Sequence, residues 1–472
     1  MRTLRGILWE TADLERRMLW AGHADVALQA IVAGTCLDGA APMPPGASVL
    51  VHTREQSSAA QALIELDGVA RRLILCPPDL SQEHLPVVIR DGEVTAVVTD
   101  RPEVLPELEA LPHYRIVDPR PLTGAGGAGS DAHVQTQWAM FTSGTTGPPK
   151  MVAHDLEGLT GAIKPMSVAG APAVWATFYD IRRYGGLQIL LRGLLSGGSM
   201  VVAGSEEPLV DLMRRMGRHG VTHVSGTPSH WRKALASGAA DMISPAYVRL
   251  SGEIADQAIL NQLRNTFPGA AIGHAYASTE AGVGFEVNDG LEGFPPSLFE
   301  PGGSAIEMKV VDGSLRIRSS RTARRYLGEA APKLADADGF VDTGDMVEMR
   351  GERYYFAGRR GGIINVGGLK VHPEEIEAVI NSFPGVRVSL AQGRRNPITG
   401  SIVIADVVLD DALKSSVSGV DEVRIRRDIL KFCHDRLAAF KVPAMLRFVP
   451  ALTMTEGGKL LRERTKSPDN GR

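Results

Sequence analysis

Short β-branched runs alternate with helical stretches along most of this chain. The first three runs are "ASVLVHT" (47–53), "RLILC" (72–76) and "VTAVVTD" (94–100), with Pro and Gly marking the breaks between elements. The alternation returns from Ser199 and continues through "YASTE" (276–280). Parallel strands need crossover connections of this kind, so the pattern predicts an α/β fold with doubly wound sheets. Ligands of such sheets bind at the carboxyl ends of the strands.

After Gly358 the pattern changes, and a smaller α+β unit is predicted. It comprises a Gly-rich hairpin (363–371), a helix beginning at "HPEEIEAVI", strands near 386–391 and 401–409, and a helix over 421–437. Because one core would be unusual for a chain of 472 residues, we predict two domains, a large one over 1–357 and a small one over 358–472. "GRRGG" (358–362) is the candidate hinge.

Charge and cysteine content narrow the class of partner. The formal charge of -3 offers no net attraction to nucleic acid or to an anionic membrane. Cys36, Cys76 and Cys433 lie far apart without a paired spacing, so neither a disulfide framework nor a zinc site is indicated. No uninterrupted apolar stretch is long enough to span a bilayer. We therefore expect a soluble, cytoplasmic protein with a small-molecule partner.

The stretch "MFTSGTTGPPKMVAH" (140–154) follows a short apolar run and is rich in small and hydroxyl residues. It is not a Walker loop, because its two glycines enclose only two threonines and the lysine comes after two prolines. Small residues let backbone N–H groups approach a ligand closely, and hydroxyls and a lysine add donors and charge. The stretch predicts a cradle for an anion such as a polyphosphate, with an ordinary polar turn as the alternative.

Five motifs occur in an order that is found in one enzyme superfamily. They are "TSGTTGPPK", "YASTE", "DTGD", "GRRGGIINVGG" and "TEGGK". On these motifs the whole chain resembles the AMP-forming acyl-adenylate ligases, which include acyl-CoA synthetases, peptide synthetase adenylation domains and firefly luciferase. The N-terminal third is short and carries little motif. The resemblance implies that a carboxylate attacks the α-phosphorus of ATP, and that a thiol or another nucleophile then attacks the acyl-AMP.

The same resemblance assigns residues to ATP and its metal. The β- and γ-phosphates would be held by Thr142, Ser143, Gly144, Thr145, Thr146, Gly147 and Lys150. Thr279 would hydrogen-bond the α-phosphate, and Glu280 would hold Mg²⁺, because a hard cation bridging phosphates prefers carboxylate oxygen. Tyr276 would stack on adenine. The structural alternatives are a packed aromatic for Tyr276 and a helix N-terminal charge for Glu280.

Three further residues complete the implied catalytic arrangement. Asp345, after a tight turn, would accept hydrogen bonds from the ribose diol, and Arg359 would support the same sugar. Lys459 resembles the lysine of the mobile C-terminal domain that enters the site for adenylation and bridges the carboxylate and the α-phosphate. The large domain would accordingly bind ATP and the acid, and the small domain would carry the catalytic lysine.

The sequence departs from the family pattern at the hinge and around the acid. The hinge position, commonly Asp or Lys, is Gly361, which permits a large backbone rotation without a side chain to hold either state. Ala277 replaces a usual glycine, and Gly252 lies at a strand end on the same predicted side. Arg183 and Tyr184 stand where many CoA ligases have an aromatic residue or His, which favours a polar or anionic acid. Two alternatives are that Asp180 holds an amine after a register shift, and that Arg182 and Arg183 are surface charges, which is the commoner position of an arginine.

The second substrate is left open by the sequence. Coenzyme A is our first interpretation, because a thiol arm could pass the glycines of "NVGGLK" (365–370), but the phosphopantetheine of an acyl carrier protein would use the same route. Other hypotheses are an adenylating enzyme that uses an amine or nitrite in specialised metabolism, and a nucleotide-binding regulatory protein without turnover. The presence of Lys459, Glu280 and Asp345 argues against the regulatory protein.

Overall fold

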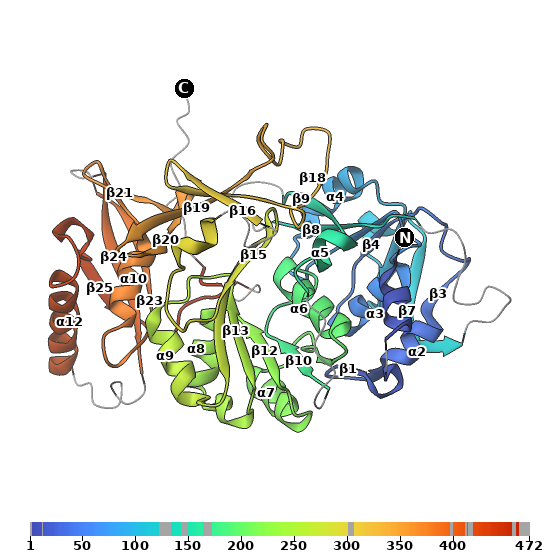
Figure 1. Cartoon of the computed structure of the whole chain (residues 1–472), viewed down its shortest axis with the longest axis horizontal. Helices are drawn as coiled ribbons and strands as arrows, with labels where there is room; N and C mark the ends of the chain where they lie inside the picture. Colours follow the sequence, from blue (N-terminus) through green and yellow to red (C-terminus); the bar gives the residue numbers. More distant parts are fainter. Residues whose placement is uncertain are drawn as a thin grey trace.

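The computed structural model describes residues 2–11, 13–121, 134–142, 149–163, 172–300, 306–396, 400–410, 413, 419–455 and 459–461. The chain forms two large mixed sheets, a smaller antiparallel sheet and a C-terminal α+β unit (Figure 1).

The N-terminal sheet has eight strands and contains the three strands predicted at 47–53, 72–76 and 94–100. Its order is β18 (Arg325–Tyr326), β9 (Met151–Asp155), β8 (Gln137–Phe141), β5 (Arg72–Leu75), β4 (Ser48–Val51), β6 (Ala96–Thr99), β7 (His113–Pro121) and β3 (Gly34–Gly39). The pairs β8·β5, β5·β4, β4·β6 and β6·β7 are parallel. The central strands are buried along their whole length, as expected for parallel strands covered on both faces.

The second sheet also has eight strands and is parallel except at its two edges. Its order is β15 (Gly282–Val287), β14 (Ala271–Ser278), β13 (Tyr247–Ser251), β12 (His223–Gly226), β10 (Val174–Thr177), β11 (Ser199–Val201), β1 (Met18–Trp20) and β2 (Asp25–Ala27). The α/β fold with doubly wound sheets is therefore confirmed.

Helices cover both faces of these sheets. The helices of the N-terminal part are α1 (Leu4–Trp9), α2 (Leu28–Ala33), α3 (Gln56–Leu66), α4 (Leu85–Gly92), α5 (Leu156–Thr160), α6 (Tyr184–Leu195), α7 (Leu209–Arg218), α8 (Pro228–Ala236) and α9 (Gln257–Thr266). Apolar residues of α3 and α6 share one core with strands of both large sheets (Figure 1). Helices α7, α8 and α9 pack on the other face of the second sheet.

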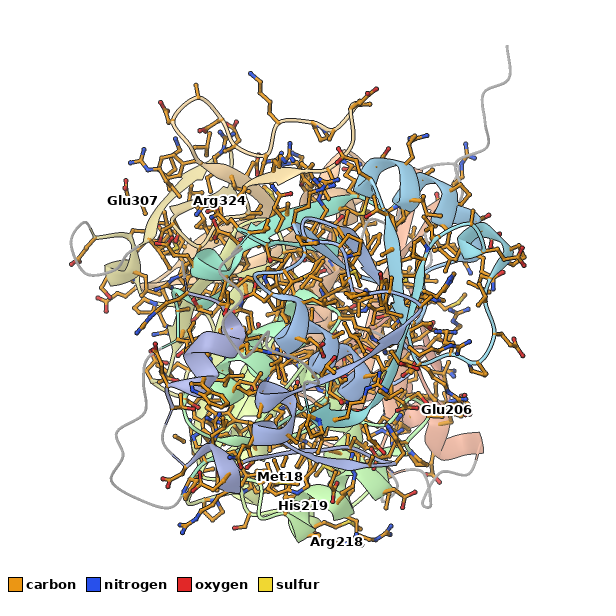
Figure 2. The ribbon with its side chains drawn as sticks, turned by 90° about the vertical axis from the view of Figure 1, so that its right-hand side faces the viewer. Met18, Glu206, Arg218, His219, Glu307 and Arg324 are labelled. Carbon is orange, nitrogen blue, oxygen red and sulfur yellow. The ribbon has the colours of Figure 1, made fainter. Side chains whose placement is uncertain are left out.

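The methionines of α7 are core residues, as their spacing predicts. Met213 and Met216 are fully buried in the cluster between α7 and the second sheet. The helix ends at the periphery of the molecule with Arg218, and the ring of the next residue, His219, stacks on Trp20 of β1 at a centroid distance of 4.4 Å (Figure 2).

The antiparallel sheet and the C-terminal unit follow. The sheet has the order β16 (Ile306–Val311), β17 (Ser314–Ser319), β19 (Val341–Arg350) and β20 (Arg353–Arg359). The C-terminal unit contains the hairpin β21 (Ile364–Val366) and β22 (Leu369–Val371), α10 (Pro373–Asn381), a sheet of β23 (Val386–Asn396), β24 (Gly400–Leu409) and β25 (Met445–Phe448), and α12 (Gly419–His434). This confirms the predicted small α+β unit. Its core, which includes Cys433, consists of residues from Ile364 onward.

None of the helices in the described ranges is long and apolar enough to cross a membrane. The division at residue 358 stays a prediction, with separate cores on the two sides in its favour.

Replacing Ile376 by Ala tests this division. Ile376 is fully buried in the C-terminal core, so its truncation is expected to destabilise that unit by about 2–5 kcal/mol. All five tryptophans precede residue 358, so tryptophan fluorescence reports only the N-terminal part. When denaturant unfolding is followed by circular dichroism, we expect the midpoint to fall. When it is followed by tryptophan fluorescence, the midpoint should stay unchanged. Ile259→Ala, in the core of the second sheet, should lower the midpoint followed by fluorescence, and a single shared transition would contradict the division.

Candidate active site

The carboxyl ends of β8 and β13 and the turn after β14 bring the sequence motifs to one side of the sheets. Strand β8 ends at Phe141, and the Thr142 amide donates to the Lys150 carbonyl at 3.0 Å, which closes the base of the candidate phosphate loop. The predicted contacts of Ser143, Gly144, Thr145, Thr146 and Gly147 lie outside the described residues. Their roles stay predictions.

His154 connects the strand after this loop to the "YASTE" turn. Its imidazole is buried on β9, and Nε2 lies 2.7 Å from the Thr279 carbonyl, so Nε2 carries the proton and donates. Burial lowers the pKa of His154 to about 4. The neutral ring therefore fixes the backbone of Thr279, the residue predicted to bind the α-phosphate. The motifs indicate no role for His154, although it is the last residue of the stretch quoted over 140–154.

Lys150 and Glu280 both contact Tyr326, one at the face of its ring and the other at its phenol oxygen. The Lys150 ammonium lies 5.7 Å from the ring centroid, within the range of a cation–π contact, and the phenol donates to Glu280 Oε1 at 3.3 Å. A cation and a carboxylate predicted to bind phosphate and metal are thus held close together. No motif included Tyr326, because it lies on the two-residue strand β18 among charged residues.

A second group joins Tyr276, Asp345 and Arg359. Asp345 lies directly opposite Arg359 in the β19·β20 ladder, and its Oδ1 accepts from Arg359 Nε at 2.9 Å. Oδ2 accepts from the Tyr276 phenol at 2.5 Å. The Asp345 charge raises the pKa of Arg359. A carboxylate with one donor on each oxygen keeps further lone pairs for other donors, as a ribose diol requires.

Aromatic rings hold Tyr276 on its sheet. Its ring stacks with Phe356 at 5.0 Å and with Phe285 at 5.6 Å. Gly284 gives it room, because a Cβ there would lie 2.9 Å from Tyr276 Cδ1. The packed aromatic role is therefore present, and stacking on adenine stays a prediction.

Lys459 reaches this site from the C-terminal unit. A Cβ built on Gly252 would lie 3.6 Å from Lys459 Cε, which places the lysine side chain against the carboxyl end of β13. Burial lowers the pKa of Lys459, and the charge of Arg359 acts in the same direction. The carboxylates of Glu253 and Asp345 oppose this shift. The structure thus brings Lys459 of the last motif close to Asp345 and Arg359 of the preceding ones.

The residues predicted around the acid have mixed surroundings. Arg183 forms an ion pair with Asp79, and its charge acts on Lys459. Tyr184 is buried at the start of α6, with its ring 5.3 Å from that of His154. Ala277 is half-buried on β14, and Gly361 lies in the short turn Arg360–Gly362.

One of the two alternatives from the sequence is wrong. Arg182 is not a surface charge, because only 2% of the residue is exposed and it donates to the Thr53 carbonyl. Arg182 also donates to both oxygens of Asp180, so this carboxylate is already paired, and its role toward an amine stays a prediction. Charged residues are exposed in most proteins, and this buried ion pair is an exception that the sequence pattern did not reveal.

Fold and site together define the class of adenylate-forming ligases. The stretch predicted to bind phosphate after β8, the carboxylate predicted to bind ribose, and the lysine of the C-terminal unit are the parts expected of this class.

Comparison with known proteins identifies the family. The AMP-binding enzyme family matches residues 70–326, and the AMP-binding enzyme C-terminal domain matches residues 375–459. The first match covers more than half of the chain. The chain belongs to the AMP-binding enzyme family, as its motifs indicate.

Its relatives include several CoA ligases. The 2-succinylbenzoate–CoA ligase of Staphylococcus epidermidis is 25% identical over 348 residues, which cover 70% of this chain and 69% of the relative. The enzyme of the same name from Bacillus subtilis is 23% identical over 451 residues, with coverages of 90% and 88%. Among solved structures, the anthranilate CoA ligase AuaEII in complex with anthranoyl-AMP has a TM-score of 0.78 at 17% identity, with coverages of 97% and 95%. It shares the fold.

His154 predicts a pH dependence of stability. A histidine whose pKa is lowered by folding stabilises the native state above its ordinary pKa of 6.5, and this stability is lost as the pH falls toward about 4. His154→Gln keeps an N–H donor but does not titrate. We expect chemical denaturation to show that the stability lost between pH 7 and pH 5 is about 2 kcal/mol smaller in the variant. Identical pH profiles would contradict the neutral, buried imidazole.

Proposed function

We propose that this protein uses ATP to activate a carboxylic acid as acyl-AMP and then transfers the acyl group to a thiol, most simply that of coenzyme A. The observation that carries this proposal is the position of Lys459 beside Gly252, near the charges of Asp345 and Arg359. A family resemblance alone would be compatible with a nucleotide-binding regulator. A buried lysine brought to the site by a separate unit serves a reaction in which negative charge moves.

The first step transfers the adenylyl group. A carboxylate oxygen of the acid attacks the α-phosphorus, and the bond between that phosphorus and the bridging oxygen of pyrophosphate breaks. Lys459 lies where an ammonium could contact both the carboxylate and the α-phosphate, so it would offset charge in the transition state. Thr279, held by His154, would hydrogen-bond the α-phosphate. Tyr276, Asp345 and Arg359 would bind the adenosine.

Glu280 would hold Mg²⁺ together with phosphate oxygens of ATP. The side chains near Glu280 fit this role, since among the described residues its carboxylate accepts a single long hydrogen bond, of 3.3 Å from Tyr326. No cluster of three or more His, Cys, Asp or Glu side chains suited to a metal occurs in the described part of the chain. Mg²⁺ commonly uses one or two carboxylates plus substrate phosphates, so a single glutamate is sufficient. The ion would neutralise charge on the phosphates.

In the second step a thiolate attacks the acyl carbonyl and AMP leaves. Lys459 must withdraw for this step, which we assign to rotation of 358–472 about Gly361. The turn between β21 and β22 carries Gly367 and Gly368 at φ values of +58° and +86°, and no atom would lie within 4 Å of a Cβ on either glycine. An open turn of this kind suits the passage of a pantetheine arm. Coenzyme A and a carrier protein both present that arm.

Lys459→Ala tests the adenylation step. We expect acid-dependent exchange of pyrophosphate into ATP to fall by about 100-fold or more, because the variant lacks the charge that balances the transition state. Thiol attack on supplied acyl-adenylate should remain. Lys431→Ala, which removes an exposed lysine of the same unit, is the control. Exchange near the wild-type rate in Lys459→Ala would contradict the assignment.

The class of acid is indicated by a cluster of arginines behind Gly252. On β13, Arg249 is 4% exposed and pairs with Glu286 Oε1 at 2.5 Å. Arg192 of α6 pairs with the same oxygen at 3.2 Å, and the charge of Arg321 acts on Arg192. Within the described chain, Arg249 and Arg192 share this one carboxylate, and its charge also acts on Arg321. The cluster therefore has an excess of positive charge.

The cluster adjoins the predicted acid site. The charges of all three arginines act on the Tyr184 phenol, and Arg249 and Glu253 both act on Tyr179. The Tyr179 ring lies 4.0 Å from the Cβ position of Gly252. The relatives from Staphylococcus epidermidis and Bacillus subtilis are named for 2-succinylbenzoate, an acid with a second carboxylate. We assign to this chain an aryl or acyl acid that carries a second anionic group.

Arg249→Gln tests this acid class. With wild-type protein, pyrophosphate exchange should be faster with dicarboxylic aryl acids than with their monocarboxylic analogues. The variant should raise the KM for the dicarboxylic acid by about 10-fold to 100-fold, since a charge-assisted hydrogen bond is lost, and leave the KM for ATP unchanged. The control is Arg215→Gln on α7, which breaks a buried ion pair between Arg215 and Glu207. Equal preference for both acids in wild type would refute the class but not the adenylation.

A further inference from the structure

Glu253 contacts both the sheet and the segment that carries Lys459. It follows Gly252 directly, at the carboxyl end of β13. Its Oε2 accepts from the Ser229 amide at 2.9 Å, and its Oε1 accepts from the Ser229 hydroxyl at 3.0 Å. Oε1 also accepts from the Leu460 amide at 3.1 Å. The carboxylate is therefore fixed to α8 on one side and bound to the C-terminal segment on the other.

The C-terminal segment is a small hairpin, and Leu460 lies next to the catalytic lysine. Within it, the Thr455 amide donates to the Lys459 carbonyl at 2.7 Å, and the Leu461 amide donates to the Thr453 carbonyl at 2.9 Å. The Lys459 amide donates to the Thr455 hydroxyl at 3.2 Å. These bonds hold the hairpin together, but they do not attach it to the sheet. The Glu253 contact does so at the peptide group that joins Lys459 and Leu460.

We propose that Glu253 is a positioning residue that holds the Lys459 hairpin in place for adenylation and releases it for thiol transfer. This role rests on the proposed function. The hydrogen bond to the Leu460 amide fixes the backbone immediately after Lys459, and therefore the direction in which the lysine side chain leaves the chain. The negative charge of Glu253 also favours the ammonium form of Lys459.

The hydrogen bond between Glu253 and the Leu460 amide is of a kind that can form and break during the reaction. The hydrogen bond from the Leu460 amide to the Glu253 carboxylate lies among half-buried residues, so water can replace either partner when the bond breaks. Such a bond shifts an equilibrium by about 10-fold to 100-fold. That range biases the lysine toward the site without preventing its departure.

Half-reactions measured separately test this role. We expect Glu253→Ala to slow acid-dependent pyrophosphate exchange by about 10-fold or more, and to leave the rate of thiol attack on supplied acyl-adenylate within about 2-fold of wild type. Glu253→Gln keeps an acceptor oxygen and should be intermediate. Equal loss of both half-reactions, or no loss of exchange, would overturn the proposal.

Two variants separate positioning from support of the fold. Ser229→Ala removes the hydroxyl contact to Glu253 but not the bond to Leu460, so it should leave the ratio of the half-reactions unchanged. Glu292→Ala removes a carboxylate that accepts from the Gln257 amide at 2.9 Å at the start of α9, without contact to the hairpin. A change in the ratio with either variant would mean that helix anchoring, not hairpin positioning, causes the effect.

Trypsin cleavage after Lys459 gives a readout that needs no activity. Wild-type protein should be protected at this bond, because the Lys459 side chain is buried and the next amide is bonded. Glu253→Ala should be cut about 10-fold faster, as followed by mass spectrometry, and Glu292→Ala should match wild type. Unchanged cleavage in Glu253→Ala would overturn the proposal even if no tested acid supported exchange. Absence of exchange in wild type, with the cleavage difference present, would refute the proposed function alone.

Discussion

The site depends on the close approach of Lys459 to Gly252. Gly252 has φ +84°, a conformation that L residues with a Cβ rarely adopt, and a side chain there would stand between the sheet and the lysine. Gly252, directly after β13, therefore lets the segment that carries Lys459 lie against the carboxyl end of this strand. Glu253, directly after it, supplies the hydrogen bond to that part. Backbone conformation and charge at two consecutive residues thus determine where the C-terminal hairpin docks.

Charge balance explains why so many ionisable groups converge here. Burial and Arg359 lower the pKa of Lys459, so without ligand the lysine releases its proton more readily than an exposed one. A bound triphosphate would add several negative charges and raise that pKa again. The ammonium form is then stabilised when the nucleotide is present. Asp345 serves two purposes, because it orients Arg359 and Tyr276 and also offsets part of the positive charge.

The sequence predicted elements and motifs well, and long-range contacts poorly. Strands such as β4, β5 and β6 were predictable because their apolar runs are continuous and bounded by turns. The resemblance of the ordered motifs to one enzyme superfamily assigned roles to the phosphate stretch and to Asp345. It could not show that His154 bonds Thr279, since the two residues are 125 positions apart and neither pattern refers to the other. Arg182 was misjudged for the same reason, because its partners Thr53 and Arg54 follow β4 in the other large sheet.

The two units meet through polar contacts, and this is what makes alternation between two reactions physically reasonable. The C-terminal core begins at Ile364, whereas the aromatic core beside it ends at Phe356, so no apolar cluster in the described chain is shared between them. Contacts across the boundary include Glu253 with the Leu460 amide and Arg350 with Glu375. Breaking such contacts replaces one polar partner by water, and it exposes little apolar surface. A shared hydrophobic core would instead oppose separation with a free energy proportional to its area, and Lys459 would remain in the site when the thiol needs to enter.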